Sequence, residues 1–144
     1  MRYLGLDLGS RTLGVAVSDK TGLIASNLEI IRHNEEYDRL VFDVQELVNS
    51  LGIDAIVLGY PKNMDGTDGV KAELSKSFKE ELEKVIDKPV YLQDERLTTK
   101  SATDMLIEGN VSRKNRKKVI DSVAASIILQ TYLDRRNKNE EEHI

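Results

Sequence analysis

The chain has 144 residues, of which 40% are hydrophobic and 32% charged, a composition typical of a folded globular protein of about one domain. It contains no cysteine, which excludes disulfides, thiolate nucleophiles and cysteine-based zinc or iron–sulfur sites. The net charge of −4 argues against a uniformly basic, nucleic-acid-binding surface, so any such surface is local. No apolar run approaches the roughly 20 residues that cross a bilayer, and strand-like sequence follows Met1 directly. We therefore expect no membrane contact, no signal peptide and a cytoplasmic location.

Three strands are predicted at the start of the chain. Residues alternate from Tyr3 to Leu8, with the leucines on one face and Tyr3, Gly5 and Asp7 on the other. Residues 13–17 alternate again, and a turn at residues 19–22 leads into a third strand at about residues 23–31. Such closely connected strands indicate an antiparallel meander.

Helices and strands then follow each other in turn. The spacing predicts a helix over residues 37–51 capped by Gly52, a buried strand at residues 55–58, a turn-rich loop at 60–69, a helix at 70–86 and a strand at 90–93. Thr98 or Thr99 can cap a further helix that runs to about residue 108. The last helix is expected from about residue 116 to residue 134, with a charged, frayed end after it.

The predicted order of elements, βββαβαβαα, defines the fold class. It indicates an α/β fold with a mixed five-stranded sheet and helices on both faces. We expect one domain over residues 1–138, followed by a charged tail over residues 139–144. The order resembles the ribonuclease H-like architecture, which by itself says little about function.

Asp7 lies on an otherwise apolar strand. A buried carboxylate is normally paired, hydrogen-bonded or bound to a metal ion, because leaving it alone costs several kcal/mol. Asp7 could therefore contribute to a metal site. It could equally cap the tight turn at residues 9–12, or pair with Arg11 in that turn.

Two further acids strengthen the metal interpretation. Asp121 shares a helix face with Ala124, Ala125 and Ile128, so it projects from a packing face; its place near the helix start is also favoured by the helix dipole. Glu95 follows the fifth strand, at the sheet edge where sites usually form. Asp94 competes with Glu95 for that role, since neighbouring strand residues point in opposite directions.

Carboxylates from two strand ends and one helix suit Mg²⁺ or Mn²⁺, and two such ions can hydrolyse a phosphodiester. We expect both histidines, His33 and His143, to be solvent-exposed and uninvolved. A basic run lies just before Asp121 and is a candidate phosphate-binding surface, although a charge run is more often a solvated face. It consists of Arg113, Lys114, Arg116, Lys117 and Lys118.

Four motifs together resemble the bacterial YqgF family, whose members are described as Holliday junction resolvases and as pre-16S ribosomal RNA nucleases. The resemblance covers residues 5–130. The motifs are Gly5-Leu6-Asp7-Leu8-Gly9 with Arg11, Gly14 and Ala16; Leu58-Gly59-Tyr60-Pro61 with Asn63, Gly66 and Thr67; Asp94-Glu95-Arg96-Leu97-Thr98-Thr99; and Asp121-Ser122-Val123-Ala124-Ala125 with Ile128-Leu129-Gln130. Tyr60 departs from the family, which more often has another apolar residue there.

The resemblance implies a ribonuclease H-like nuclease whose catalytic, metal-binding triad is Asp7, Glu95 and Asp121. Structured RNA, the 5′ end of pre-16S rRNA, is the expected substrate. Four-way DNA junctions are the alternative, and a resolvase would act as a homodimer rather than a monomer. Positioning of phosphates is expected from Arg11, Arg96 and the basic run, with support from Gly9, Asp94, Thr98 and Thr99.

Two hypotheses of another class remain open. The first strand and its turn also resemble the phosphate loop of actin and sugar-kinase ATPases, which bind nucleotide between two lobes. The second hypothesis is a non-catalytic ribosome-assembly module, which would need the fold but not the carboxylates of Asp7, Glu95 and Asp121.

Overall fold

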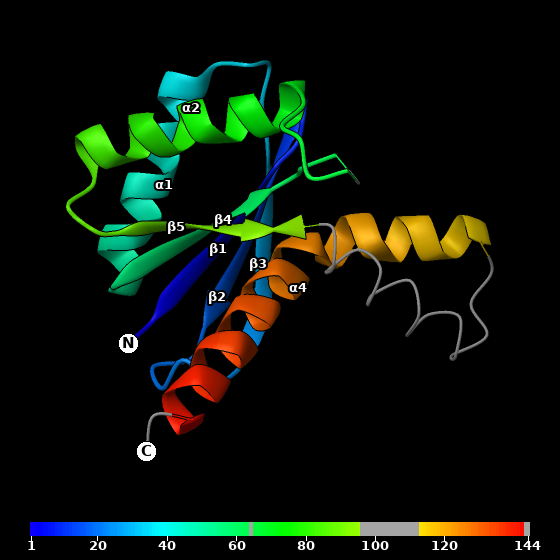
Figure 1. The fold of residues 1–144 in the computed structure, drawn as a ribbon. Coiled ribbons are helices and arrows are strands. Elements are labelled where there is room, and N and C mark those ends of the chain that lie inside the picture. Colours follow the sequence, from blue (N-terminus) through cyan, green and yellow to red (C-terminus); the bar gives the residue numbers. More distant parts are fainter. Residues whose placement is uncertain (64, 96–112, 143–144) are drawn as a thin grey trace.

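The computed structural model describes residues 1–63, 65–95 and 113–142, and within the last range the side chains of residues 123–138. The elements, in chain order, are β1 (Tyr3–Leu8), β2 (Thr12–Ser18), β3 (Ala25–Arg32), α1 (Tyr37–Leu51), β4 (Ala55–Tyr60), α2 (Val70–Val85), β5 (Val90–Asp94) and α4 (Arg113–Glu142) (Figure 1). The helix expected after Thr98 or Thr99 lies outside the described residues.

The strands form one five-stranded sheet in the order β3-β2-β1-β4-β5. Strands β1, β2 and β3 pair antiparallel, as the predicted meander requires, whereas β4 and β5 run parallel to β1. The carboxyl ends of β1, β4 and β5 therefore meet at the same edge of the sheet.

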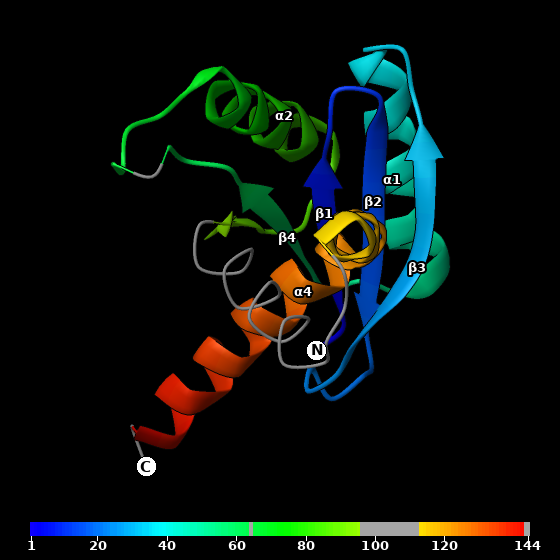
Figure 2. The same ribbon diagram turned by 90° about the vertical axis from the view of Figure 1, so that its right-hand side faces the viewer.

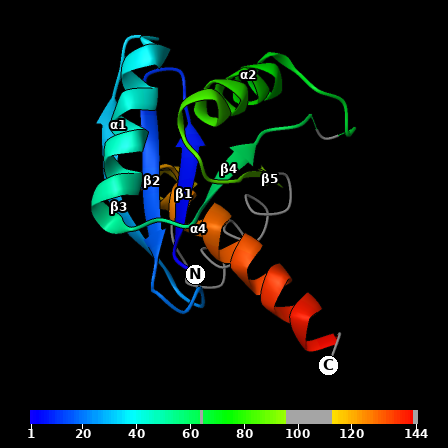
Figure 3. The ribbon, with the colours of Figure 1, turned by 90° about the vertical axis from the view of Figure 1, so that its left-hand side faces the viewer.

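Helices cover both faces of the sheet. Helix α4 lies in front of β1 and β2 in Figure 2, whereas α1 lies in front of the sheet in Figure 3, which views the molecule from the opposite side. Gly52 caps α1 with a φ of 66°, the left-handed conformation expected of a helix-ending glycine.

The alternation along β1 and β2 divides the core in two. On one side the buried side chains of α1 and α2 pack against Leu4, Leu6, Leu13 and Val15. On the other, α4 packs against smaller residues and Tyr3. A Cβ on Gly5 would lie 2.7 Å from Leu129 Cβ and 3.1 Å from the Ala125 carbonyl oxygen, so α4 contacts the backbone of β1 directly.

The predicted boundaries are wrong at the start of β3 and at both ends of the last helix. Strand β3 begins at Ala25 rather than Leu23, because the Asp19 carboxylate accepts the N–H groups of Leu23 and Ile24 and extends the turn. The last helix begins at Arg113 rather than at about residue 116, and it continues to Glu142 instead of ending at about residue 134.

Tertiary contacts explain why α4 does not fray at residue 135. The Arg136 guanidinium lies 5.4 Å from the Tyr3 ring centroid, and Asn137 Nδ2 donates to the Gly22 carbonyl at 3.2 Å. Lys, Arg and Glu also favour helix, so a charged sequence can extend a helix whose preceding turns are anchored. In the part of the chain that the structure describes, no helix is long and apolar enough to cross a bilayer.

Candidate active site

Asp7 and Glu95 meet at the carboxyl edge of the parallel strands. Asp7 is the penultimate residue of β1 and pairs in register with Gly14 of β2. Glu95 follows β5 directly. The two carboxyl groups are hydrogen-bonded to each other, so strands β1 and β5, which are separated by β4 in the sheet, bring their acids to one point.

Asp7 shares the α4 face of β1 with Tyr3 and Gly5, as the alternation predicts. A Cβ on Gly14 would lie 3.6 Å from Asp7 Cβ and 3.4 Å from Ala125 Cβ. Asp7 is half-buried, and its carboxyl group therefore emerges where the sheet edge and α4 come together.

Glu95 lies over a position that has no side chain. A Cβ on Gly59 of β4 would come within 2.9 Å of Glu95 Cδ, 3.1 Å of Glu95 Oε2 and 2.8 Å of Ile128 Cδ1. The glycine thus makes room for the carboxyl group to cross β4 toward Asp7. The sequence placed Gly59 directly after a predicted strand and in one of the four motifs, but it gave no sign of this close approach.

Burial raises the pKa of Glu95 well above its usual range, and the charge of Asp7 and the hydrogen bond to it raise this pKa further. Lys71 acts in the opposite direction, and Asp94 adds a smaller upward effect. Two carboxyl groups this close cannot both ionise readily without a cation, so they share a proton. Between the two alternatives that the sequence left open, Glu95 is the acid hydrogen-bonded to Asp7.

The pair fits a hard divalent cation in the chemistry of its donors. Carboxylate oxygens are the ligands that Mg²⁺ and Mn²⁺ prefer, and a cation can replace the proton that the pair shares. Among the described side chains no group of three possible ligands is found. Asp121 lies in α4 one turn before Ala125, but its side chain is outside the described residues, and its role stays a prediction.

The turn between β1 and β2 forms the rim beside Asp7. The Gly9 N–H donates to the Thr12 carbonyl at 2.7 Å. Arg11 is exposed, and its Nη1 donates to Asn34 Oδ1 at 3.0 Å. A predicted phosphate-binding cation therefore lies two residues beyond Gly9, on the outer side of the turn.

The expectation that His33 is exposed is wrong. Its side chain is 5% exposed, and its ring lies against the turn at residues 9–12. The alternation of β3 could not reveal this burial, because the carbonyl partners of the ring belong to a distant turn. His143 lies outside the described residues.

Lys71 is a candidate site residue that the sequence did not single out. It lies in the first turn of α2, exposed, and its charge acts on Glu95. The sequence feature that could have identified Lys71 is its position in the first turn of the helix that follows the loop after β4. Nearby, Lys76 pairs with Asp68 at 2.6 Å and lies 5.6 Å from the Tyr60 ring centroid, which ties the loop at residues 61–69 to α2.

The remaining predicted site residues are not placed by the structure. Arg96, Thr98 and Thr99 lie outside the described residues. The basic run belongs to the first turns of α4, where the backbone is described but the side chains are not.

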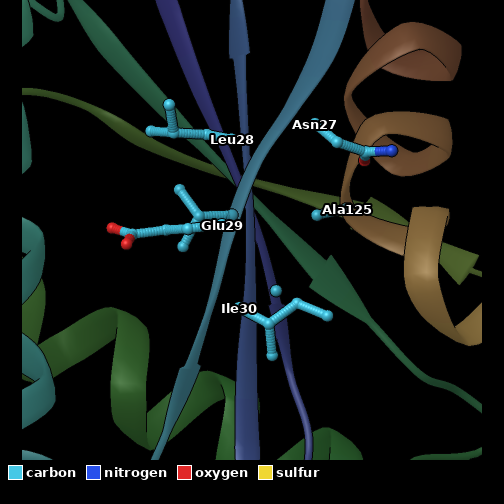
Figure 4. Close-up of a pocket in the computed structure, with 7 residues that line it drawn as sticks. Asn27, Leu28, Glu29, Ile30 and Ala125 are labelled. Carbon is cyan, nitrogen blue, oxygen red and sulfur yellow. The ribbon is translucent and has the colours of Figure 1, made fainter.

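A small hollow lies next to the site, between β3 and α4 (Figure 4). Asn27 points from β3 toward α4, while Leu28 points to the other side of the strand. The hollow reaches Gly14 and Ala125, the two residues beside Asp7, but neither Asp7 nor Glu95 lines it. It is therefore a neighbour of the acid pair and not the site itself.

Comparison with known proteins identifies close relatives over almost the whole chain. A protein of Streptococcus pneumoniae (strain Hungary19A-6), named "Putative pre-16S rRNA nuclease", is 51% identical over 138 residues, covering 94% of this chain and 99% of the relative. A protein of the same name from Geobacillus thermodenitrificans (strain NG80-2) is 52% identical over 135 residues, covering 93% and 98%.

Among solved structures, Thermus thermophilus RuvC in complex with a Holliday junction substrate superposes with a TM-score of 0.63 and 17% identity over 96% of each chain. This likeness confirms the predicted ribonuclease H-like fold. The family model described as "RuvX: Holliday junction resolvase" matches residues 1–135. The chain therefore belongs to the RuvX family, the same family that the four motifs resemble under the name YqgF.

Proposed function

We propose that this protein is a divalent-metal-dependent nuclease that hydrolyses phosphodiester bonds in structured RNA, with the 5′ end of pre-16S rRNA as its substrate. The observation that carries the proposal is the hydrogen-bonded pair of Asp7 and Glu95 at the carboxyl edge of the parallel strands. Family membership supports a hydrolase that cuts nucleic acid, and the names of the two relatives support this RNA.

Asp7 and Glu95 would hold Mg²⁺ or Mn²⁺, with Asp121 as the third ligand. When bound, two such ions supply an activated water and stabilise the leaving oxygen of the phosphodiester. Glu95 has to lose its proton to serve as a ligand, and the positive charge of Lys71 favours that loss. Gly59 leaves the space that the Glu95 carboxylate occupies.

The backbone of the substrate would lie across the rim of the site. Arg11, four residues after Asp7 on the β1–β2 turn, and Lys71, whose charge acts on Glu95, are both exposed cations. Arg96 and the basic run at residues 113–118 extend this surface in the proposal. Each cation would neutralise a phosphate without reading sequence.

The direct test is cleavage of an RNA that spans the 5′ end of 16S rRNA, in Mn²⁺ or Mg²⁺. Asp7→Asn should abolish cleavage, because an amide cannot replace a carboxylate ligand. Asp87→Asn is the matched control, since Asp87 is exposed in the turn between α2 and β5. Both variants are purified in parallel with the wild type to exclude contaminating ribonuclease. Retained cleavage by Asp7→Asn would refute the assignment.

Cleavage of four-way DNA junctions is the second candidate, because the matched family model is described as a Holliday junction resolvase. The same preparations are therefore tested on a junction with labelled arms. Symmetric cuts by a homodimer would favour this substrate, whereas a monomer active only on RNA would favour rRNA processing.

Two experiments test the alternatives of another class. Calorimetry with ATP tests the nucleotide-binding alternative, for which heat of binding is required. Cells whose only copy carries Asp7→Asn test the assembly-module alternative, which predicts normal 16S rRNA ends. Maturation of rRNA would place the protein in the bacterial cytoplasm.

A further inference from the structure

His33 is built into the turn that follows Asp7. It comes directly after β3, and its backbone N–H donates to the Arg11 carbonyl at 2.9 Å. Its ring Nε2 lies 3.0 Å from the Gly9 carbonyl oxygen and 3.3 Å from the Thr12 carbonyl oxygen. One residue thus contacts three carbonyl groups of a turn whose residues 10–12 are exposed.

The hydrogen bonds select one form of the ring. The Glu35 N–H donates to His33 Nδ1 at 3.0 Å, so Nδ1 is the acceptor nitrogen. The carbonyls of Gly9 and Thr12 can only accept, so Nε2 carries the proton. The ring is therefore the Nε2–H tautomer, and both nitrogens are satisfied.

Two further features hold the ring in this orientation. Glu35 has a φ of 65°, and it is the one non-glycine residue with positive φ in the part of the chain that the structure describes. Its N–H reaches Nδ1 in that conformation. The Tyr37 ring packs against the imidazole with centroids 6.0 Å apart. The corner between β3 and α1 thus presents a fixed N–H to the β1–β2 turn.

We infer that His33 is a positioning residue for the metal site: its Nε2–H holds the β1–β2 turn so that the Asp7 carboxylate stays opposite Glu95. The inference rests on the proposed function, because it assigns Asp7 as a metal ligand. Gly9 is two residues from Asp7 along the chain, so a movement of the Gly9 carbonyl rotates the end of β1. Groups that orient metal ligands affect metal affinity about 10- to 100-fold when removed.

A purely structural role is the competing explanation, in which His33 only stabilises the corner through Glu35. Two substitutions separate the roles, because each keeps one half of the hydrogen bonding. His33→Gln can place an amide N–H near the position of Nε2 and donate to Gly9 and Thr12. His33→Asn can place an amide oxygen near the position of Nδ1 and accept from Glu35 but cannot reach the turn.

The experiment measures Mn²⁺ affinity by calorimetry, thermal stability, and kcat and KM for RNA cleavage in both variants and the wild type. We expect His33→Asn to bind Mn²⁺ at least about tenfold more weakly and to lose kcat with little change in KM, while His33→Gln stays within about threefold of wild type. Equal Mn²⁺ affinity in His33→Asn and wild type, or equal losses in both variants, would overturn the inference.

Nitrogen NMR of the imidazole in the wild-type protein provides a test that needs no variant to fold. The Nε2–H tautomer is expected, and an Nδ1–H tautomer would overturn the inference. These measurements also distinguish failure of the positioning role of His33 from failure of the proposed function. Weaker Mn²⁺ binding by His33→Asn in a protein that cleaves neither RNA nor DNA junctions would refute the nuclease and leave the positioning role standing.

Discussion

The carboxyl groups of Asp7 and Glu95 are hydrogen-bonded to each other although their strands, β1 and β5, are not neighbours in the sheet. Strand β4 lies between them, and Gly59 of β4 provides the gap that Glu95 spans. The contact therefore depends on a missing side chain as much as on the two acids. It also places a proton where the proposed function requires a cation.

The metal-free protein should lose stability as pH rises. The folded-state pKa of Glu95 is raised by burial and by Asp7, whereas the unfolded value is about 4.3. The folded state therefore binds more protons between these two values. The contribution of Glu95 to the free energy of unfolding is complete below about pH 4.3, and it is lost as pH rises through the folded-state pKa of Glu95. Thermal melts in EDTA at increasing pH measure this loss.

Two variants and the addition of Mn²⁺ make the pH prediction specific. Glu95→Gln should remove this component of the pH dependence, and Asp7→Asn should reduce it, because the charge of Asp7 causes part of the shift. Mn²⁺ should reverse the loss at high pH, since a ligand at about 100 times its Kd stabilises by about 2.7 kcal/mol. A pH profile identical in wild type and Glu95→Gln would contradict the shared proton.

The sequence predicted that Asp7 meets an acid from the end of the fifth strand, because the carboxyl ends of parallel strands share an edge. Strand alternation left Glu95 and Asp94 as alternatives, and the structure shows the hydrogen bond to Glu95. The sequence could not predict that His33 is buried, because its ring partners are backbone carbonyls of a turn that only the folded sheet brings near. Nor could it predict the end of α4, because the contact between Arg136 and Tyr3 is a tertiary contact that charge composition does not indicate.

Gly59→Ala should impair catalysis more than folding. The new methyl would overlap the ends of two flexible side chains, Glu95 and Ile128, which can move aside at a cost of about 1–3 kcal/mol. Moving Glu95 separates it from Asp7, so Mn²⁺ affinity and kcat should fall at least about tenfold. Gly14→Ala is the control, because its methyl meets Ala125 and Asp7 at ordinary contact distances of 3.4 and 3.6 Å. Equal activity of the two variants would contradict the role of Gly59.

Lys71→Gln should weaken both substrate and metal binding. Removing its charge raises the pKa of Glu95 further, so Mn²⁺ affinity measured near neutral pH should fall, and less so at higher pH where Glu95 is ionised in either protein. Loss of a phosphate contact should raise KM and reduce the salt dependence of RNA binding by about one charge. Lys88→Gln replaces an exposed lysine in the turn between α2 and β5, and it should change none of these three quantities. Salt dependence equal to wild type would exclude Lys71 as a phosphate contact.

Gly5→Ala should destabilise the fold itself. Its methyl would lie 2.7 Å from Leu129 Cβ and 3.1 Å from the Ala125 carbonyl oxygen, and neither atom can rotate away as a side-chain end can. Helix α4 would have to move off β1, at a cost of about 1–3 kcal/mol or more. Chemical denaturation should show this loss beside a near-neutral Gly14→Ala on the same sheet face. Because α4 also carries Asp121, the variant should lose Mn²⁺ affinity even at temperatures where it is fully folded. Wild-type stability in Gly5→Ala would mean that α4 does not pack on β1 as closely as the structure has it.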